Sequence, residues 1–281
     1  ISAALCFSLL VHPFFTRCLS ASHLATIRYD NSGDGPNSWP HRKDSICAFI
    51  HRVDPDIIDM QEVLHHQLEV LKTGLPEYTV VGVGREDGKT AGEYAPIFFK
   101  QAKYTLLDQN TFWLCEKPDS VGMVGWDAAL TRIATWVKLQ DKKTGQILMV
   151  VNTHFDHIGT EARRNSALLI IEKIKEIVGT SPAILTGDFN VSEDWDAYKT
   201  ITNNEFILKD AHKVAGKRTG VDFTYHNFGK IPAEKCEKID FIFVTPQIRV
   251  ISSYIPFSQL NDTLFLSDHN PEIVELEIEK S

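Results

Sequence analysis

The sequence predicts a four-layer α/β sandwich, in which two mixed β-sheets pack together and helices flank them on the outside. Segments with strand patterns outnumber those with helical patterns, and the helices follow mainly the first, second and central strands. The chain has 281 residues, of which 43% are hydrophobic, and neither a repeat nor a flexible linker interrupts it. It is therefore long enough for one large domain, which we place at residues 23–281.

The first 22 residues differ in character from the rest of the chain. Residues 3–10 are mostly apolar, and the small residues at 20–22 are of the kind that precede a peptidase cleavage point. Residues 1–22 are therefore predicted to be a signal peptide of a secreted or periplasmic protein. The alternative is an ordinary apolar N-terminal strand or helix, in which case the protein would be cytoplasmic. The segment is too short and too interrupted for a stable membrane span.

The remaining elements are predicted from periodicity and from turn residues. Helical spacing of apolar residues predicts helices over residues 44–53, 66–72, 160–178 and 194–202. Apolar and β-branched runs between turn residues predict strands at residues 24–29, 57–60, 78–83, 97–100, 104–107, 132–140, 147–152, 183–185, 206–208, 223–226, 239–245, 248–253 and 271–278.

The short strand at residues 183–185 organises the rest of the chain. Its continuous apolar run is typical of a strand buried on both faces, and Gly187 ends it. Asp188 and Asn190 follow two positions apart, so on an extended segment their side chains point the same way. A carboxylate beside a carboxamide suits a hard cation together with a phosphate. The structural alternative is a capped turn, which Asp and Asn also favour.

Polar side chains close several other predicted strands, and each has a structural alternative. Glu62 could cap the helix that follows it, and His154 could be a hydrogen-bonded core histidine. Asp240 lies in an otherwise apolar run, so it is expected to be buried and to need a partner. His269 is a candidate for that partner, because an Asp–His pair fixes the imidazole tautomer and makes it a stronger base. Asp268 beside it could orient a water or hold a cation.

Five motifs in this order resemble the endonuclease/exonuclease/phosphatase superfamily, which has the DNase I-like fold. They are Gln61–Glu62, Asn152–His154, Thr186–Asn190, Ile239–Asp240 and Ser267–His269. Each motif is weak alone, but five in order are specific, and the likeness covers nearly the whole chain after residue 22. Further stretches resemble a bacterial, often secreted branch of the superfamily, at residues 27–31, 82–85, 92–97, 125–128 and 132–136.

The resemblance implies a metal site and an activated water. Glu62 corresponds to the main Mg²⁺ ligand, with Asp268 near the metal, and Mn²⁺ is the alternative ion. Asp188 corresponds to the residue that orients or deprotonates the attacking water. Phosphoryl transfer mainly requires positioning and charge neutralisation, which fits an ion held by few carboxylates.

The resemblance also implies the contacts to the phosphate. His154 would touch the scissile phosphate and stabilise its growing charge, and Asn190 would hold phosphate or metal. His269, supported by Asp240, would act on the phosphate or as a base. Arg132 is a further candidate phosphate ligand, on the chemistry of its side chain rather than on the resemblance, since its guanidinium fork matches phosphate oxygens. The alternative is a structural salt bridge.

Two further expectations concern single positions. The family's first strand usually ends in an Asn that binds metal or phosphate, and Thr26 occupies that place here. The alternative is that the strand has lost two residues, Tyr–Asn, which leaves side-chain alternation intact. In both cases an amide is missing, which predicts weakened activity or metal affinity. Tyr94 and Trp126 are candidates for the rim of the substrate site, with Arg28 and Asp30 beside them. Asp156 and His157 are expected on the surface of a loop.

The net charge of the chain limits the class of substrate. The net charge is -8 and the pI is about 5.8. This charge is opposite in sign to that of a protein that binds long nucleic acid through the phosphate backbone of the nucleic acid. We therefore expect a monomeric, metal-dependent phosphodiesterase or phosphomonoesterase acting on a small sugar- or lipid-linked phosphate. The alternatives are an extracellular nuclease, for which nucleic acid would be the partner, and a binding module that kept the fold without turnover.

Overall fold

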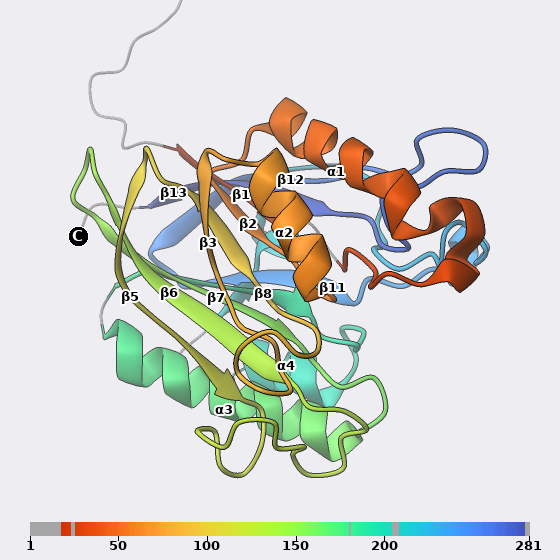
Figure 1. Ribbon diagram of the computed structural model, residues 1–281. Coiled ribbons are helices and arrows are strands. Elements are labelled where there is room, and N and C mark those ends of the chain that lie inside the picture. The colour runs from red at the N-terminus through yellow and green to blue at the C-terminus, as the bar shows by residue number, and fades with distance from the viewer. Residues whose placement is uncertain (1–17, 24–25, 180, 204–207, 279–281) are drawn as a thin grey trace, which may run out of the picture.

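The computed structural model describes residues 18–23, 26–179, 181–203 and 208–278, and its strands form two sheets (Figure 1). Within these residues, one sheet has seven strands in the order β10 (Lys217–Gly220), β12 (Ile248–Ile255), β13 (Glu272–Ile278), β1 (Cys18–His23), β2 (Ile57–Asp59), β4 (Ile97–Lys100) and β3 (Tyr78–Val81). The other has six, in the order β5 (Tyr104–Trp113), β6 (Ile133–Asp141), β7 (Ile147–His154), β8 (Ala183–Asp188), β11 (Asp240–Val244) and β9 (Lys209–Asp210). Both sheets are mixed, because β7 and β8 run parallel, as do β1 and β2.

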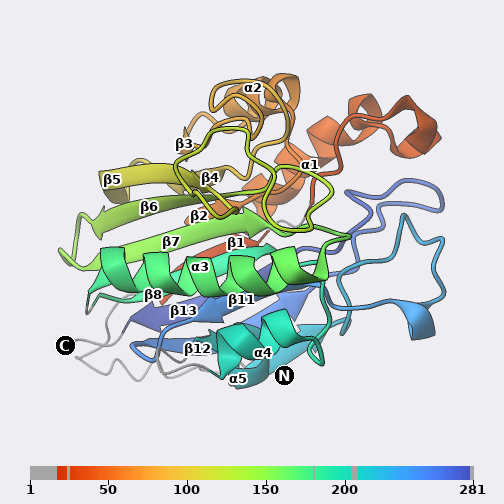
Figure 2. The same ribbon diagram turned by 90° about the horizontal axis from the view of Figure 1, so that it is seen from below.

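Helices cover the outer face of each sheet. The helix α1 (Trp39–Val53) and the helix α2 (His65–Gly74) share a core with the seven-stranded sheet. The helix α3 (Thr160–Val178) and the helix α4 (Asp196–Thr202) pack on the six-stranded sheet, and Figure 2 shows α3 lying across its outer face. The short elements η1 (Ser32–Asn37), α5 (Ala211–Val214) and η2 (Ala233–Lys235) lie in connections. The predicted four-layer sandwich is confirmed.

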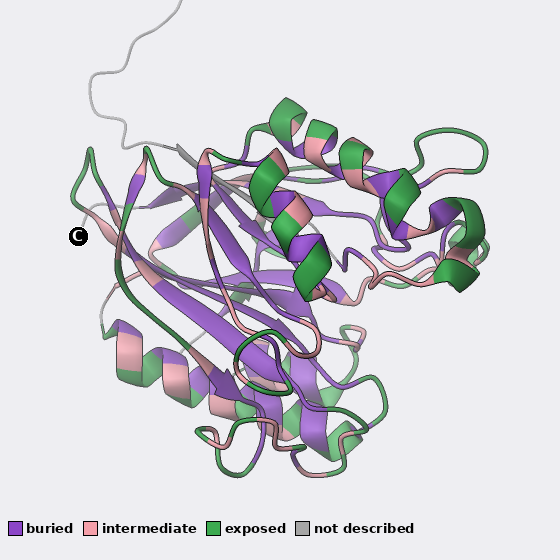
Figure 3. Ribbon diagram, viewed as in Figure 1, coloured by how far each residue is buried: buried purple, intermediate pink, exposed green. Residues whose placement is uncertain are grey.

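Strand alternation decides which residues fill each layer. On β8, Ile184 belongs to the core between the two sheets, whereas Leu185 packs toward α3. On β11, Ile242 and Phe243 divide in the same way. The strands nearest the site, β2, β4, β6, β7, β8 and β11, are buried along most of their length (Figure 3), whereas β10 is exposed and β5 largely so. A polar residue on an inward position of these buried strands is therefore shielded from water.

The first strand lies earlier in the sequence than predicted. The expected strand at residues 24–29 is wrong: β1 is Cys18–His23, and it lies between β13 and β2. Residues 24–25 are outside the described residues, and from Thr26 the chain is irregular, with Ile27 N donating to Gln61 O at 3.0 Å. Of the predicted signal peptide, residues 1–17 are outside the described residues, and the predicted cleavage point before His23 falls within β1.

Two other predicted strands have different outcomes. Residues 223–226 form no strand; Tyr225 makes only isolated bridges, to Glu237 and to His269. Most of the strand predicted at 206–208 lies outside the described residues. Among the residues that the structure does describe, no helix combines the length and the apolar surface that crossing a bilayer requires.

Candidate active site

The site is built from a row of polar residues at the ends of three neighbouring strands. In the six-stranded sheet, His154 of β7 is in register with Asp188 of β8, and Asp188 is in register with Asp240 of β11. Alternation places them on the face that carries Ile184 and Ile242, which is the face turned toward the other sheet. Strand register therefore places three ionisable side chains next to one another.

Asp240 and His269 form the pair that the sequence predicted. His269 Nδ1 lies 2.7 Å from Asp240 Oδ2, and both side chains are buried. Burial alone would lower the pKa of His269, but the charge and hydrogen bond of Asp240, together with Asp188, raise that pKa to about 10. His269 is therefore an imidazolium whose second nitrogen, Nε2, lies 4.0 Å from Asp188 Oδ2.

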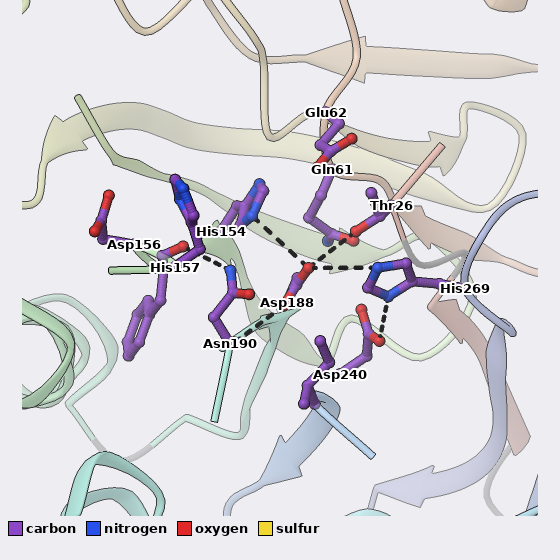
Figure 4. A network of polar contacts seen from close by, with 12 residues as sticks. Thr26, Gln61, Glu62, His154, Asp156, His157, Asp188, Asn190, Asp240 and His269 are labelled. Carbon is purple, nitrogen blue, oxygen red and sulfur yellow. Dashed lines mark hydrogen bonds and ion pairs between the residues drawn. The ribbon is translucent and has the colours of Figure 1, made fainter. Parts of the chain in front are cut away.

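Asp188 lies at the centre of the site and is fixed at both oxygens. Asn190 N donates to Oδ1 at 3.0 Å, and Thr26 Oγ1 donates to Oδ2 at 3.1 Å. His154 and His269 flank Asp188 from opposite sides (Figure 4), with His154 Nε2 3.7 Å from Oδ2. Burial and the charge of Asp240 raise the pKa of Asp188 to about 7, a value suited to a proton acceptor near neutral pH.

Three residues of the site hold a left-handed backbone conformation without being glycine. The φ angles are 62° at Arg28, 59° at Glu62 and 50° at Asn190. The carboxamide of Asn190 donates to Phe155 O at 3.0 Å, which ties the turn after β8 to the end of β7. Such conformations cost energy and persist where the surroundings enforce them, as functional sites often do.

A second group of carboxylates faces this row across the cleft. Glu62 Oε2 accepts a hydrogen bond from Tyr29 N at 3.3 Å, and Asp268 Oδ2 lies 3.8 Å from Arg28 Nε. Burial, followed by the charges of Asp268 and Glu93, raises the pKa of Glu62 to about 8. This surplus of oxygen ligands and negative charge fits a divalent cation of the Mg²⁺ type.

A buried acidic and histidine cluster is also compatible with a divalent ion. Ligand atoms of Asp188, Asp240 and His269 all lie within 4.8 Å of one another. Because the His269 imidazolium already bridges the two carboxylates there, the Glu62 and Asp268 side of the cleft has the greater need of a cation.

Arg132 lines the cleft and also forms the salt bridge that was its structural alternative. Its Nε is 3.4 Å from Asp156 Oδ2, and its Nη2 is 3.1 Å from His157 Nδ1. Its Nη1 is buried and has no hydrogen-bond partner among the described residues. A buried guanidinium nitrogen without a partner is available to an anion.

The expectation that Asp156 lies on the loop surface is wrong. Asp156 is 2% exposed, and its carboxylate accepts hydrogen bonds from four backbone N–H groups, at Ala129, Leu130, Ile158 and Gly159. Burial opposes its ionisation, but these bonds and Arg132 lower the pKa of Asp156 to about 2. The carboxylate thus holds together two loops at the mouth of the cleft, while His157 is exposed and lines it.

The cleft has a volume of about 430 Å³ and contains most of the predicted site. It is lined by Arg28, Tyr29, Glu62, Glu93, Leu130, Arg132, His154, His157, Asp188, Asn190, Tyr225, Ile239, Asp268 and His269. Asp240 supports it from behind through His269. Of the predicted rim residues, Arg28 lines the cleft, whereas Tyr94 is buried beside it, and Trp126 and Asp30 do not line it.

Several residues of the cleft were not predicted from the sequence, including Glu93, Leu130 and Tyr225. The ring of Tyr225 lies 4.9 Å from that of His269, centroid to centroid. Glu93 stands in a stretch that carried the family resemblance but received no role. An acidic residue four positions before the buried strand β4 was the local indication of it.

Two packed mixed sheets with a cleft of histidines, carboxylates and an amide near their strand ends have the arrangement of the DNase I-like fold. The chain belongs to the endonuclease/exonuclease/phosphatase family, whose model matches residues 27–269. Members of this family hydrolyse phosphoesters, and the site described above has the groups for that reaction. The chain is accordingly a phosphoester hydrolase by family.

Similar structures and sequences extend over most of the chain. The endonuclease/exonuclease/phosphatase from Bacteroides vulgatus is 60% identical with a TM-score of 0.91, covering 94% of this chain and 100% of its own. A mannosyl-6-phosphatase from Bacteroides thetaiotaomicron is 35% identical with a TM-score of 0.86, covering 92% and 99%. An uncharacterized protein of Acanthamoeba polyphaga mimivirus is 29% identical over 253 residues, 85% of this chain and 92% of that protein.

Proposed function

We propose that this protein is a Mg²⁺-dependent hydrolase of small phosphate esters, with Mn²⁺ as an alternative ion and sugar-linked phosphates as the first substrates to test, ahead of lipid-linked ones. The observation that carries the proposal is the row of His154, Asp188 and Asp240 in strand register, completed by His269. This arrangement combines a proton acceptor, a buried cation and a neutral donor around one point of the cleft.

Asp188 is the group that we assign to the water. Its two oxygens are held by Asn190 N and by Thr26 Oγ1, so the carboxylate has a fixed direction. A pKa of about 7 lets it accept a proton from an attacking water at neutral pH. The adjacent His269 imidazolium, held by Asp240, donates to a phosphate oxygen and stabilises the charge there.

The remaining phosphate contacts come from the other side of Asp188. Burial and the nearby Arg132 lower the pKa of His154 well below its usual value, so His154 contributes a neutral imidazole as hydrogen-bond donor. Arg132 contributes the buried Nη1, which has no partner among the described residues. Asn190 lines the same part of the cleft.

Glu62 and Asp268 are the residues that would hold the metal ion. Both line the cleft, and the crowding of acidic groups around Glu62 fits a divalent cation. When bound, Mg²⁺ would supply charge neutralisation for the phosphoryl oxygens.

The substrate class rests on charge and on similarity. A net charge of -8 disfavours a long polyanion, and a structure 35% identical to this chain is a mannosyl-6-phosphatase. Both observations support a small phosphate linked to a sugar over nucleic acid.

The test is a panel of phosphate esters assayed with Mg²⁺, with EDTA, and with the variant His269→Ala. The panel contains p-nitrophenyl phosphate, bis-p-nitrophenyl phosphate, a hexose 6-phosphate, an inositol phosphate, a sphingomyelin analogue and plasmid DNA. We expect turnover of a small ester that requires metal and is lost in His269→Ala. His51→Ala is the matched control, because His51 lies in the last turn of α1 and does not line the cleft.

Preferred turnover of plasmid DNA would instead identify a nuclease. Absence of turnover across the panel, in the wild type and equally in Thr26→Asn, would favour a binding module that retained the fold. Thr26 motivates this second candidate, since the family usually has an Asn there. The buried polar groups of the site argue against it, because a chain without turnover gains nothing from their desolvation.

A further inference from the structure

Glu93 is a carboxylate fixed at the edge of the cleft by a dedicated arginine. Arg85 Nη1 donates to Glu93 Oε2 at 2.7 Å, and Arg85 Nη2 donates to Oε1 at 3.1 Å. The backbone joins the same two residues, since Arg85 N donates to Glu93 O at 3.1 Å. The next residue, Tyr94, donates from its backbone N to Val63 O at 2.8 Å. Glu93 therefore has a defined direction and a side chain that is 16% exposed.

The position of Glu93 is unusual for a site that binds phosphate. Its Oε2 lies 3.9 Å from His154 Nδ1, on the opposite side of that imidazole from the 3.7 Å contact between Nε2 and Asp188. Arg132, His154 and Glu93 also line one small cavity next to the main cleft. A carboxylate repels a phosphate at such short range, so the part of the substrate that meets Glu93 is not the phosphate.

The cleft thus has three parts with different chemistry. His154, Asp188 and His269 form the central row, and Glu62, Asp268 and Arg28 form the acidic side suited to a cation. A third part contains Glu93, Leu130 and His157, of which Glu93 and His157 lie beside Arg132, and we assign it to the alcohol of the ester.

Arg85 makes Glu93 a better acceptor for neutral donors than for a second metal ion. The guanidinium contacts both carboxylate oxygens, so a divalent cation would have to compete with it. Each carboxylate oxygen has a further lone pair, which accepts a hydroxyl hydrogen without displacing the guanidinium. Leu130 offers an apolar contact of the kind that the C–H face of a sugar or a polyol uses.

We propose that Glu93 is a specificity-determining residue that accepts hydrogen bonds from hydroxyl groups of the leaving alcohol. The proposal rests on the proposed function and names its substrate class more closely: monoesters of phosphate with a polyhydroxylated alcohol. An oligonucleotide or other substrate with a second phosphate group that entered this part of the cleft would meet the carboxylate and be disfavoured.

The experiment compares two primary phosphate monoesters of equal carbon number, a hexose 6-phosphate and n-hexyl phosphate. The measured quantity is the ratio of their kcat/KM values, in the wild type and in Glu93→Gln and Glu93→Ala. We expect the wild type to favour the hexose ester, and we expect each variant to lower the ratio about 10- to 100-fold, since charge-assisted hydrogen bonds to the hydroxyls are lost. Glu86→Gln is the matched control: this exposed residue of the same loop does not line the cleft, so the ratio should stay unchanged.

The other outcomes overturn the proposal in distinguishable ways. Equal losses on both esters would show that Glu93 supports His154 or the loop. A shift in the Mg²⁺ concentration for half-maximal rate, at an unchanged ratio, would make Glu93 a metal ligand. A circular-dichroism melting curve for each variant separates these results from unfolding. If the wild type hydrolyses no phosphate ester with any divalent metal, the proposed function itself fails and this inference with it.

Discussion

The two sheets contribute to the active site in different ways. The six-stranded sheet supplies His154, Asp188 and Asp240 from the ends of adjacent strands, where register alone sets their spacing. The seven-stranded sheet supplies Glu62 and Glu93 from turns beyond its strands, where Glu62 needs a left-handed backbone and Glu93 needs Arg85. Under the proposed function, regular structure would carry the chemical centre, and loops would carry metal affinity and specificity.

The largest effect should come from the strand-end row. We expect Asp188→Asn to lower kcat/KM about 10²- to 10⁴-fold, because an amide cannot accept a proton from water. The change is isosteric, so the thermal midpoint should change far less than activity. Steady-state assays with Asp119→Asn, an exposed aspartate, provide the control. Activity above a tenth of the wild type would remove Asp188 from the role of base.

A smaller and different effect should come from the acidic side. Glu62→Gln should raise the Mg²⁺ concentration needed for half-maximal rate about 10- to 100-fold, with partial recovery of kcat at high metal. A metal titration measures this, with Glu172→Gln on the exposed face of α3 as control. If recovery at high metal is absent and the midpoint is unchanged, Glu62 is not a metal ligand.

A third prediction concerns the stability of the seven-stranded sheet, which Asp59 should make dependent on pH. This carboxyl at the end of β2 is fully buried, and burial, opposed by Thr186, raises its pKa to about 8. A group whose folded pKa lies above its unfolded value loses its stabilising contribution as pH rises from about 4 toward 8. Asp59→Asn should therefore raise the free energy of unfolding at pH 8 relative to pH 5, by on the order of 2 kcal/mol. Denaturant unfolding of both proteins at the two pH values measures it, and an equal difference at both would contradict the prediction.

The smallest effect should come from Thr26, where a loop residue meets the strand-end row. Thr26→Val removes the hydroxyl that donates to Asp188 Oδ2 and should lower kcat about 5-fold, the value of one hydrogen bond. Thr26→Asn should raise kcat a few-fold, since the family usually places an amide there. Measured side by side, kcat should be lower than the wild-type value in Thr26→Val and higher than it in Thr26→Asn. An unchanged or lower kcat in Thr26→Asn would mean that Thr26 already fulfils the role of the family's Asn.

The strand-end residues could be predicted because their evidence is local. Asp240 interrupts an apolar run of alternating orientation, so its burial and its need for a partner followed from the sequence, and His269 proved to be that partner. Asp188 and Asn190 were placed by their position after a buried strand. The sequence also predicted α3 with its observed bounds, since a regular apolar stripe over 19 residues specifies a helix.

The errors have a common origin in contacts between distant segments. The first strand was placed at residues 24–29, whereas pairing with β13, more than 240 residues away, selects Cys18–His23. Asp156 was predicted on the surface because no residue near it in the sequence indicates its distant partners. These are the backbone N–H groups of Ala129 and Leu130, which donate to its carboxylate. The proximity of Glu93 to His154, which lie 61 positions apart, was equally invisible.

The sequence by itself predicted the layers and the polar residues at the strand ends, because periodicity and residue type act over a few neighbouring positions; the roles of those residues were implied by the family resemblance. Only the tertiary structure decided which carboxylates share the cleft, how Asp188 is held by Thr26, and that Arg85 fixes Glu93 at the edge of the cleft. Those relations depend on how loops from different strands pack against one another. The free energy of that packing is a property of the whole chain rather than of any local segment.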